Sequence, residues 1–207
     1  MNRKTGIYAS IITFIAVAVF ALCMLFGAIL NNDSPGKAGS YFSSICIALG
    51  FVSMVCAYIS YMPSENKAVG LIALSFSIMY CVTIIIVYFT QLTTLRLQVL
   101  SEEAKALLDY SEFGLFFNYD LLGYAFMALA TFFTGVKLET KSRNEKILKY
   151  LLCIHGIFAV SCFVMPILGV FSADMAGGNI IGTIVLEFWC IYFMPICLLS
   201  YGYFKNR

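Results

Sequence analysis

Residues 68–92 read AVGLIALSFSIMYCVTIIIVYFTQL and contain no charged side chain. The hydrocarbon core of a bilayer is about 30 Å thick and a helix rises about 1.5 Å per residue, so about 20 apolar residues suffice to cross it. The stretch is longer than this and no charge interrupts it. It therefore predicts a helix that spans a membrane.

Five other segments of the chain have a similar length and apolar character. Turn-forming or charged residues separate them, such as NNDSPG at 31–36 and the charged run 137–146. We therefore predict an all-α polytopic integral membrane protein, in which 1–207 form one domain, a bundle of six transmembrane helices. The predicted spans are 6–30, 41–62, 68–92, 113–136, 147–171 and 178–203.

The composition of the whole chain leads to the same class. Of its 207 residues, 61% are hydrophobic and 12% are charged, whereas a soluble domain has about 45–50% and about 25%. A soluble enzyme, a nucleic-acid binder, a disordered chain and a secreted disulfide scaffold are excluded. We expect the lipid bilayer as the partner and no nucleic acid. The 8 cysteines fall in apolar stretches without a CxxC pair, so we expect reduced packing residues, no metal site and no cofactor.

The distribution of Lys and Arg predicts the orientation of the spans. With the N-terminus in the cytoplasm, ten of the 13 basic residues lie on the cytoplasmic side, and only Lys37, Arg96 and Lys105 lie outside. Positive charge collects in cytoplasmic loops. We therefore predict a multi-pass protein of the cell membrane with both termini in the cytoplasm.

The longest connection between predicted spans, 93–112, carries its own helix signal. Ser101 precedes two glutamates and the apolar positions Leu107 and Leu108, a pattern typical of a capped helix start. We predict an extension of the third span and then a short helix on the outer surface. This segment is either a lid over a binding site or a plain connector, and the connector is favoured.

Three ionisable side chains lie well inside the predicted spans: Asp120, His155 and Glu187. Such groups are costly in a bilayer and are therefore default candidates for a functional site. At about 1.5 Å per residue, Asp120 lies roughly 10 Å and Glu187 roughly 13 Å below the outer surface. His155 falls in the inner half, where we expect either a hydrogen-bonded link between helices or a proton relay.

Helical spacing places further polar residues on the same faces as the two acids. Residues three or four apart share a helix face, which predicts three polar stripes that converge on a cavity open to the outer side. We take as candidate ligand-binding or proton-binding residues Asp120, Glu187, Tyr124, Tyr80, Gln91, Asn179 and Thr183.

Two buried carboxylates suggest three kinds of function. A carboxylate pair can exchange protons against a cation or bind an amine between aromatic walls, as in a transporter-like or ligand-binding protein. Alternatively, the acids only hold helices together in a sensor, immunity or accessory subunit without catalysis. An intramembrane acid–base enzyme is the third candidate, but no catalytic motif is present. We therefore assign no catalytic residue. The sequence is also compatible with a homo-oligomer.

Several short segments of the sequence are similar to segments of a known group of membrane proteins. These are Arg3-Lys4-Thr5-Gly6, Asn66-Lys67, Asp120-Leu121-Leu122-Gly123-Tyr124, Asn144-Glu145-Lys146-Ile147-Leu148 and Ile181-Gly182. In this arrangement the chain resembles a family of small bacterial six-span membrane proteins of unknown function. The resemblance implies a bacterial cytoplasmic-membrane protein and brings no established activity.

Overall fold

The computed structural model describes residues 1–30, 33–171 and 178–207, and in this part of the chain the regular structure is all helical. Among these described residues, six helices are long and apolar enough to cross a membrane. They confirm the predicted all-α membrane protein with six spans. The candidate spans are Asn2–Gly27, Gly36–Ile59, Ser64–Leu95, Leu115–Val136, Arg143–Ile167 and Thr183–Lys205.

Some of these spans combine more than one helical element. Residues 64–95 comprise the short η1, the helix α3 and the π-helical turn η2, whereas 143–167 comprise α6 and α7. The α-helices are α1 (Asn2–Leu30), α2 (Asp33–Ile59), α3 (Lys67–Thr90), α4 (Glu102–Leu108), α5 (Leu115–Val136), α6 (Arg143–His155), α7 (Ile157–Ile167) and α8 (Gly178–Lys205). The short elements are η1 (Ser64–Asn66), η2 (Gln91–Leu95) and η3 (Tyr110–Glu112).

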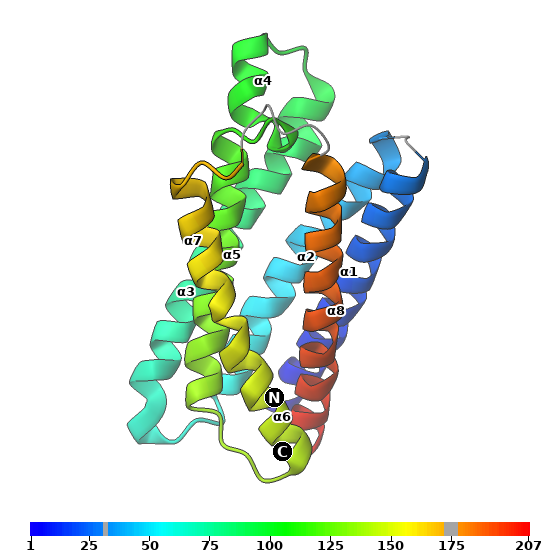
Figure 1. Cartoon of the computed structure of the whole chain (residues 1–207). Coiled ribbons are helices and arrows are strands. Elements are labelled where there is room, and N and C mark those ends of the chain that lie inside the picture. The colour runs from blue at the N-terminus through cyan, green and yellow to red at the C-terminus, as the bar shows by residue number, and fades with distance from the viewer. Residues whose placement is uncertain (31–32, 172–177) are drawn as a thin grey trace.

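The helices form a bundle that carries both termini at one end and α4 at the other (Figure 1). We call these the termini end and the α4 end. α1 packs along α2 and α8, α2 packs on α3, and α5 contacts α3, α6 and α7. The helices α3, α5 and α8, to which the three polar stripes were assigned, meet in the interior through the buried rings of Tyr80, Tyr124 and Trp189.

Close helix contacts in the bundle depend on small residues. A side chain on Gly50 of α2 would overlap the Thr13 hydroxyl of α1, so the two helices approach more closely than larger residues allow. Apolar side chains such as Phe51, Met54 and Phe193 fill the interior and are almost fully buried. Large apolar side chains such as Phe89, Val160 and Ile191 lie exposed on the outer faces, where lipid would cover them.

The fifth span is interrupted at Gly156, between α6 and α7. A Cβ atom there would lie 2.9 Å from Cβ of Phe132 and 3.0 Å from the carbonyl oxygen of Cys153. Only glycine therefore fits at this contact with α5. The interruption directly follows His155 and positions its ring against α5 and α8.

The connection at the α4 end has the predicted short helix. Ser101 caps α4 by accepting a hydrogen bond from the backbone N–H of Ala104 at 3.3 Å. The π-helical turn η2 extends α3 beyond Thr90. The expected extension of the third span and the helix that starts after Ser101 are both confirmed.

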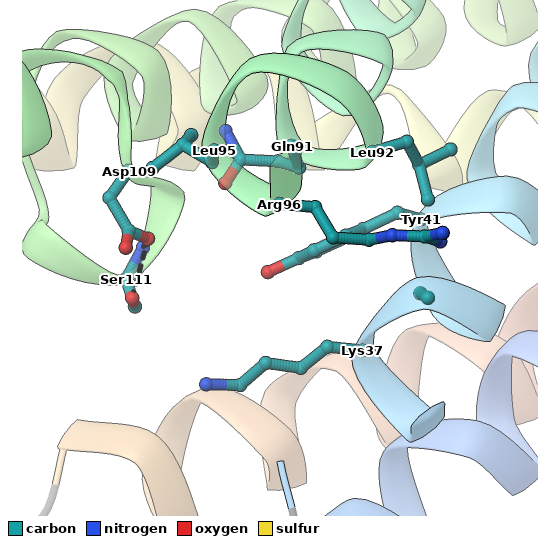
Figure 2. Close-up of a pocket in the computed structure, with 9 residues that line it drawn as sticks. Lys37, Tyr41, Gln91, Leu92, Leu95, Arg96, Asp109 and Ser111 are labelled. Atoms are coloured by element: carbon teal, nitrogen blue, oxygen red, sulfur yellow. Dashed lines mark hydrogen bonds between the residues drawn. The ribbon is translucent and has the colours of Figure 1, made fainter. Parts of the chain in front are cut away.

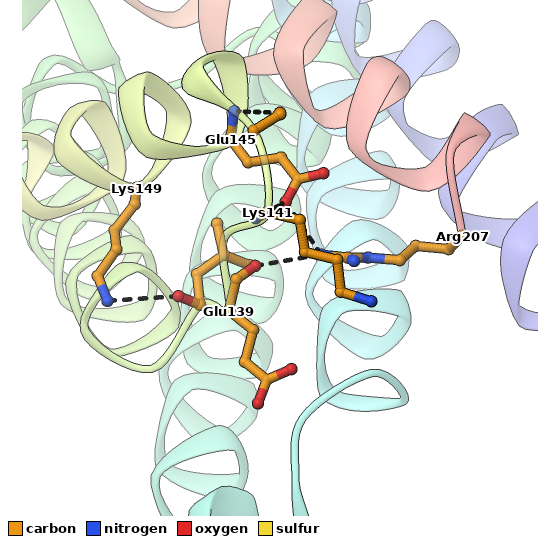
Figure 3. Close-up of polar contacts among 7 residues, drawn as sticks. Glu139, Lys141, Glu145, Lys149 and Arg207 are labelled. Atoms are coloured by element: carbon orange, nitrogen blue, oxygen red, sulfur yellow. Dashed lines mark hydrogen bonds and ion pairs between the residues drawn. The ribbon is translucent and has the colours of Figure 1, made fainter.

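At the termini end, a buried ion pair links the start of α6 to the last residue of the chain (Figure 3). An Arg207 guanidinium nitrogen lies 3.2 Å from Oε2 of Glu145 and donates to the Glu139 carbonyl at 3.1 Å. The same Glu145 oxygen accepts from the backbone N–H of Lys141 at 2.6 Å. The side chains of Arg207 and Glu145 are only 10% and 8% exposed, so this pair fixes the 137–142 connection against α8.

Candidate functional site

Asp120 lies in the interior of the bundle, within a group of tyrosines. It is 2% exposed on α5. Its carboxyl acts electrostatically on Tyr80 and Tyr88 of α3, on Tyr124 one turn further along α5, and on Tyr110 of η3. Tyr88 also forms a side-chain hydrogen bond to Asp120. A carboxyl group thus lies among four phenol rings from three elements.

Several polar atoms around Asp120 have no hydrogen-bond partner. Among the described residues, the buried side-chain oxygens without a partner are Tyr80 OH, Asp120 Oδ1, Tyr124 OH and Glu187 Oε1. A buried polar group left without a partner costs about 1–3 kcal/mol. Such atoms are unusual in a folded protein, so this group of residues is the candidate site. All four belong to residues that the sequence identified as candidates.

Aromatic contacts connect these residues across three helices. The Tyr80 and Tyr124 rings have centroids 5.9 Å apart, and Tyr124 meets Trp189 of α8 edge-on at 5.3 Å. Tyr80 is fully buried, and Tyr124 and Trp189 are 8% and 5% exposed. The rings therefore form a rigid wall from α3 through α5 to α8 beside the Asp120 carboxyl.

Glu187 lies on α8, two residues before Trp189. Its side chain is half-buried, and Cys190 one turn further on lies within electrostatic range of both Glu187 and Tyr124. Within the described part of the chain, no hydrogen bond joins Glu187 to Asp120. The two acids belong to one region of the bundle but are not a hydrogen-bonded carboxyl pair.

Gln91 has a different environment from the other candidates. Its Nε2 donates to the Leu108 carbonyl at 2.7 Å, and its Oε1 accepts from the Tyr110 backbone N–H at 3.3 Å. Both ends of the amide therefore hold the α4–η3 segment against η2. Gln91 also lines a pocket at the α4 end, described below.

The two remaining candidates on α8 are Thr183 and Asn179. Thr183 is half-buried, one turn before Glu187. The Asn179 side chain lies outside the described residues.

His155 forms hydrogen bonds through both ring nitrogens. The indole N–H of Trp189 donates to Nε2 at 3.1 Å, and Nδ1 lies 2.8 Å from the Thr131 hydroxyl. That hydroxyl donates to the Ala128 carbonyl at 2.8 Å, so its oxygen is left to accept from Nδ1–H. These roles assign a neutral imidazole with its proton on Nδ1. His155 thus links α5, α6 and α8, and the link continues through Trp189 to Tyr124.

Tyr88 and Tyr110 are residues of this site that the sequence reasoning missed. Tyr88 follows Tyr80 by two helical turns and shares its buried face, so the same spacing argument would have found it. Tyr110 lies in the connection after α4 and reaches Asp120 only through the tertiary fold. No periodic signal marks such a residue.

The chemistry of the site is that of hydrogen-bond acceptors and aromatic faces. No group of three or more His, Cys, Asp or Glu suited to a metal occurs among the residues that the structure describes. Carboxylate oxygens, phenol oxygens and ring faces together suit a small cation or an amine. In comparisons with known proteins, no family model, no curated protein and no solved structure matches the chain.

Proposed function

We propose that this protein binds a small cation or amine at Asp120 and exchanges it against a proton, as a transporter-like protein of the membrane. The observation that supports this proposal best is the group of four unpartnered oxygens on Tyr80, Asp120, Tyr124 and Glu187. A bound cation would interact with the unused lone pairs of the Asp120, Tyr80 and Tyr124 oxygens. It would also offset the cost of a charged carboxylate in a low-dielectric interior.

The unused lone pairs of these oxygens favour a positively charged ligand, which they can coordinate or accept hydrogen bonds from. Asp120 Oδ1 can only accept when the carboxylate is charged, and the Tyr80 and Tyr124 oxygens can each accept one bond. An ammonium group donates three. With the ligand absent, a proton on Asp120 takes over charge compensation, so ligand and proton compete for the same carboxylate.

Glu187 gives the proposed site a second protonation position. It is half-buried on α8, where polar atoms are otherwise scarce between Val185 and Ile191. We assign it to proton transfer towards the bundle exterior, whereas Asp120 holds the ligand. In the orientation predicted from the basic residues, the α4 end faces outward and the site lies in the outer half of the bilayer.

The single tryptophan of the chain provides a native reporter of this site. Trp189 contacts Tyr124 edge-on, so a cation bound at Asp120 changes the surroundings of the indole. We expect titration of the detergent-solubilised protein with sodium, potassium or tetramethylammonium chloride to give a saturable change in Trp189 emission for at least one of the three salts. Asp120→Asn abolishes that change.

The matched control is Tyr119→Phe, because Tyr119 adjoins Asp120 in sequence but its side chain is 40% exposed, whereas Asp120 is buried. This variant retains the response of the parent protein. If none of the three salts gives a saturable change in the parent, or if Asp120→Asn responds like the parent, the proposal is wrong.

Transport is tested in proteoliposomes that contain a pH-sensitive dye. An external pulse of the salt that gave the Trp189 response should raise the lumenal pH of vesicles with the parent protein, because protons leave as the cation enters. Vesicles with Asp120→Asn should show only the leak of protein-free vesicles. Saturable binding without this pH change would mean that the protein binds the cation but does not exchange it against protons across the membrane.

The His155 contacts favour a second candidate, a sensor or accessory subunit without transport. All polar groups of the His155, Thr131 and Trp189 link are used within the protein, as expected of a structural element. In that function, the Trp189 response to ligand is present and the lumenal pH change is absent.

A further inference from the structure

A separate pocket of about 230 Å³ opens at the α4 end, between the start of α2 and the η2 turn (Figure 2). Lys37 lies one residue inside the second candidate span, and Arg96 lies one residue beyond the third. The pocket is therefore level with the ends of the spans. This is the depth at which lipid headgroups lie against a membrane protein.

Two basic side chains and one acidic side chain line the described part of the pocket. Lys37 from α2 and Arg96 from the end of η2 are both exposed and line it together with Asp109. Oδ1 of Asp109 accepts from the Ser111 backbone N–H at 2.8 Å and from the Ser111 hydroxyl at 2.6 Å. The acid is thus engaged within its own turn, on the far side of the pocket from Arg96 (Figure 2).

The rest of the lining is partly apolar. Ala38, Leu92 and Leu95 are half-buried and contribute hydrocarbon surface beside the cations. Tyr41 completes the wall and packs on Tyr88, with ring centroids 5.4 Å apart. A pocket that combines two cations, an aromatic ring and leucines at headgroup depth matches a ligand with a charged head and an apolar body.

We propose that this pocket binds the phosphodiester of an anionic lipid headgroup. A phosphodiester carries one negative charge on its two free oxygens, and the guanidinium group of Arg96 in the pocket lining can meet it. The Arg96 guanidinium can donate two parallel hydrogen bonds to phosphate oxygens, and Lys37 supplies a second point charge. The leucines contact the glycerol and the first acyl carbons. This site is distinct from the Asp120 site and does not depend on the function proposed for it.

The test measures the dissociation constant of three probes with detergent-solubilised protein: dioctanoyl-phosphatidylglycerol, dimethyl phosphate and dioctanoylglycerol. We expect phosphatidylglycerol to bind and dioctanoylglycerol, which has no phosphate, to bind at least about tenfold more weakly. Arg96→Gln should weaken phosphatidylglycerol binding at least about tenfold, equal to about 1.4 kcal/mol. Added salt weakens it further, because screening reduces the attraction of exposed charges.

Dimethyl phosphate distinguishes a lipid from a free phosphodiester. Much weaker binding of dimethyl phosphate than of phosphatidylglycerol identifies a lipid site with an apolar contribution. Equal affinities would contradict the lipid and identify a site for a soluble phosphodiester.

Lys105→Gln is the matched control, since Lys105 is exposed at the same end and forms its ion pair with Glu102 at 2.9 Å. It should change the affinity less than twofold, and so should Asp120→Asn. Arg96→Lys keeps the charge but not the paired hydrogen-bond donors, so its affinity for phosphatidylglycerol should lie between those of the parent and Arg96→Gln. Equal losses in Arg96→Gln and Lys105→Gln, or equal binding of dioctanoylglycerol, would overturn the proposal.

Discussion

The indole N–H of Trp189 donates to Nε2 of His155 at 3.1 Å, across the contact between α8 and α6. Through this bond His155 holds a ring that itself packs against Tyr124, beside Asp120. The neutral histidine therefore sets the position of one wall of the candidate site from the other half of the bundle. Its imidazole also stacks on Tyr192, with centroids 5.8 Å apart.

His155→Phe should destabilise the protein, because the substitution keeps an aromatic ring but leaves the Trp189 indole N–H without an acceptor. We expect a loss of about 1–3 kcal/mol in the free energy of unfolding, measured by SDS titration in mixed micelles, and a shift of the Trp189 emission maximum. Tyr150→Phe, at a position 67% exposed on the same helix, is the control. Equal stability of His155→Phe and the parent would show that the hydrogen bond is not formed.

Tyr80→Phe should stabilise the ligand-free protein by about 1 kcal/mol, because it removes a buried hydroxyl that has no partner. The same substitution at Tyr58 is the matched control, since the Tyr58 hydroxyl donates to Ser200 at 2.5 Å in an equally buried position. Tyr58→Phe should destabilise the protein. Stability changes of the same sign in both variants would contradict the assignment of Tyr80 OH as an unpartnered group.

Gln91→Ala should release the α4–η3 segment without unfolding the bundle. It removes the acceptor of the Tyr110 backbone N–H and the donor to the Leu108 carbonyl, so we expect faster amide hydrogen exchange over 108–112 than in the parent. Exchange within α5 should not change. Gln98→Ala changes an exposed residue in the same connection and should leave the exchange rates at 108–112 as they are in the parent. Equal rates in the two variants would contradict the role of Gln91 in holding the α4–η3 segment.

Glu145→Gln should destabilise the termini end, because it leaves the largely buried Arg207 guanidinium without its charged partner. Breaking a buried pair by removing one member costs about 3 kcal/mol, again measured by SDS titration. Glu139→Gln is the control, since Glu139 contributes only its backbone carbonyl to the same contact. If Glu139→Gln lost as much stability as Glu145→Gln, the effect would come from removing any negative charge at this end and not from breaking the ion pair with Arg207.

The stability of the first turn of α4 should depend on pH. The backbone N–H of Glu103 and the Ser101 hydroxyl hydrogen-bond to the Glu103 carboxylate and hold the pKa of this exposed group below its ordinary value. Because the pKa of Glu103 is lower in the folded protein, its ionised carboxylate stabilises α4 at any pH above the ordinary pKa of a glutamate. This stabilisation is lost as the pH falls through the lowered value. In an NMR titration, Ser101→Ala should raise the pKa of Glu103, and an unchanged value would contradict the cap.

Much of the fold follows from the sequence, because a bilayer restricts the possibilities for the backbone. Backbone groups in lipid must be satisfied within the segment, so long apolar runs such as 68–92 can only be helices. The short helix at Glu102 follows from Ser101 and the acids after it, which are local signals. The interruption at Gly156 does not follow, because its cause is the contact with Phe132 on another helix.

The sequence predicts which residues of the candidate site share a face of one helix, but not how the helices are arranged around the site. The spacing of Asp120 and Tyr124 places both on one face of α5, and the spacing of Tyr80 places it on the buried face of α3. The relation between helices depends on their rotation and tilt, which no periodicity encodes. For this reason the sequence identified Gln91 as a ligand candidate, whereas its amide is occupied by the α4–η3 segment, and missed Tyr110.

The central claim is that a cation and a proton compete for Asp120, and the most direct measurement is proton release on cation binding. A salt that saturates the Trp189 response is added to purified protein in weakly buffered detergent solution with a pH indicator. The account predicts release of up to one proton per bound cation in the parent protein and none in Asp120→Asn. Saturating cation binding without proton release at every starting pH, or equal release from Asp120→Asn, would contradict it.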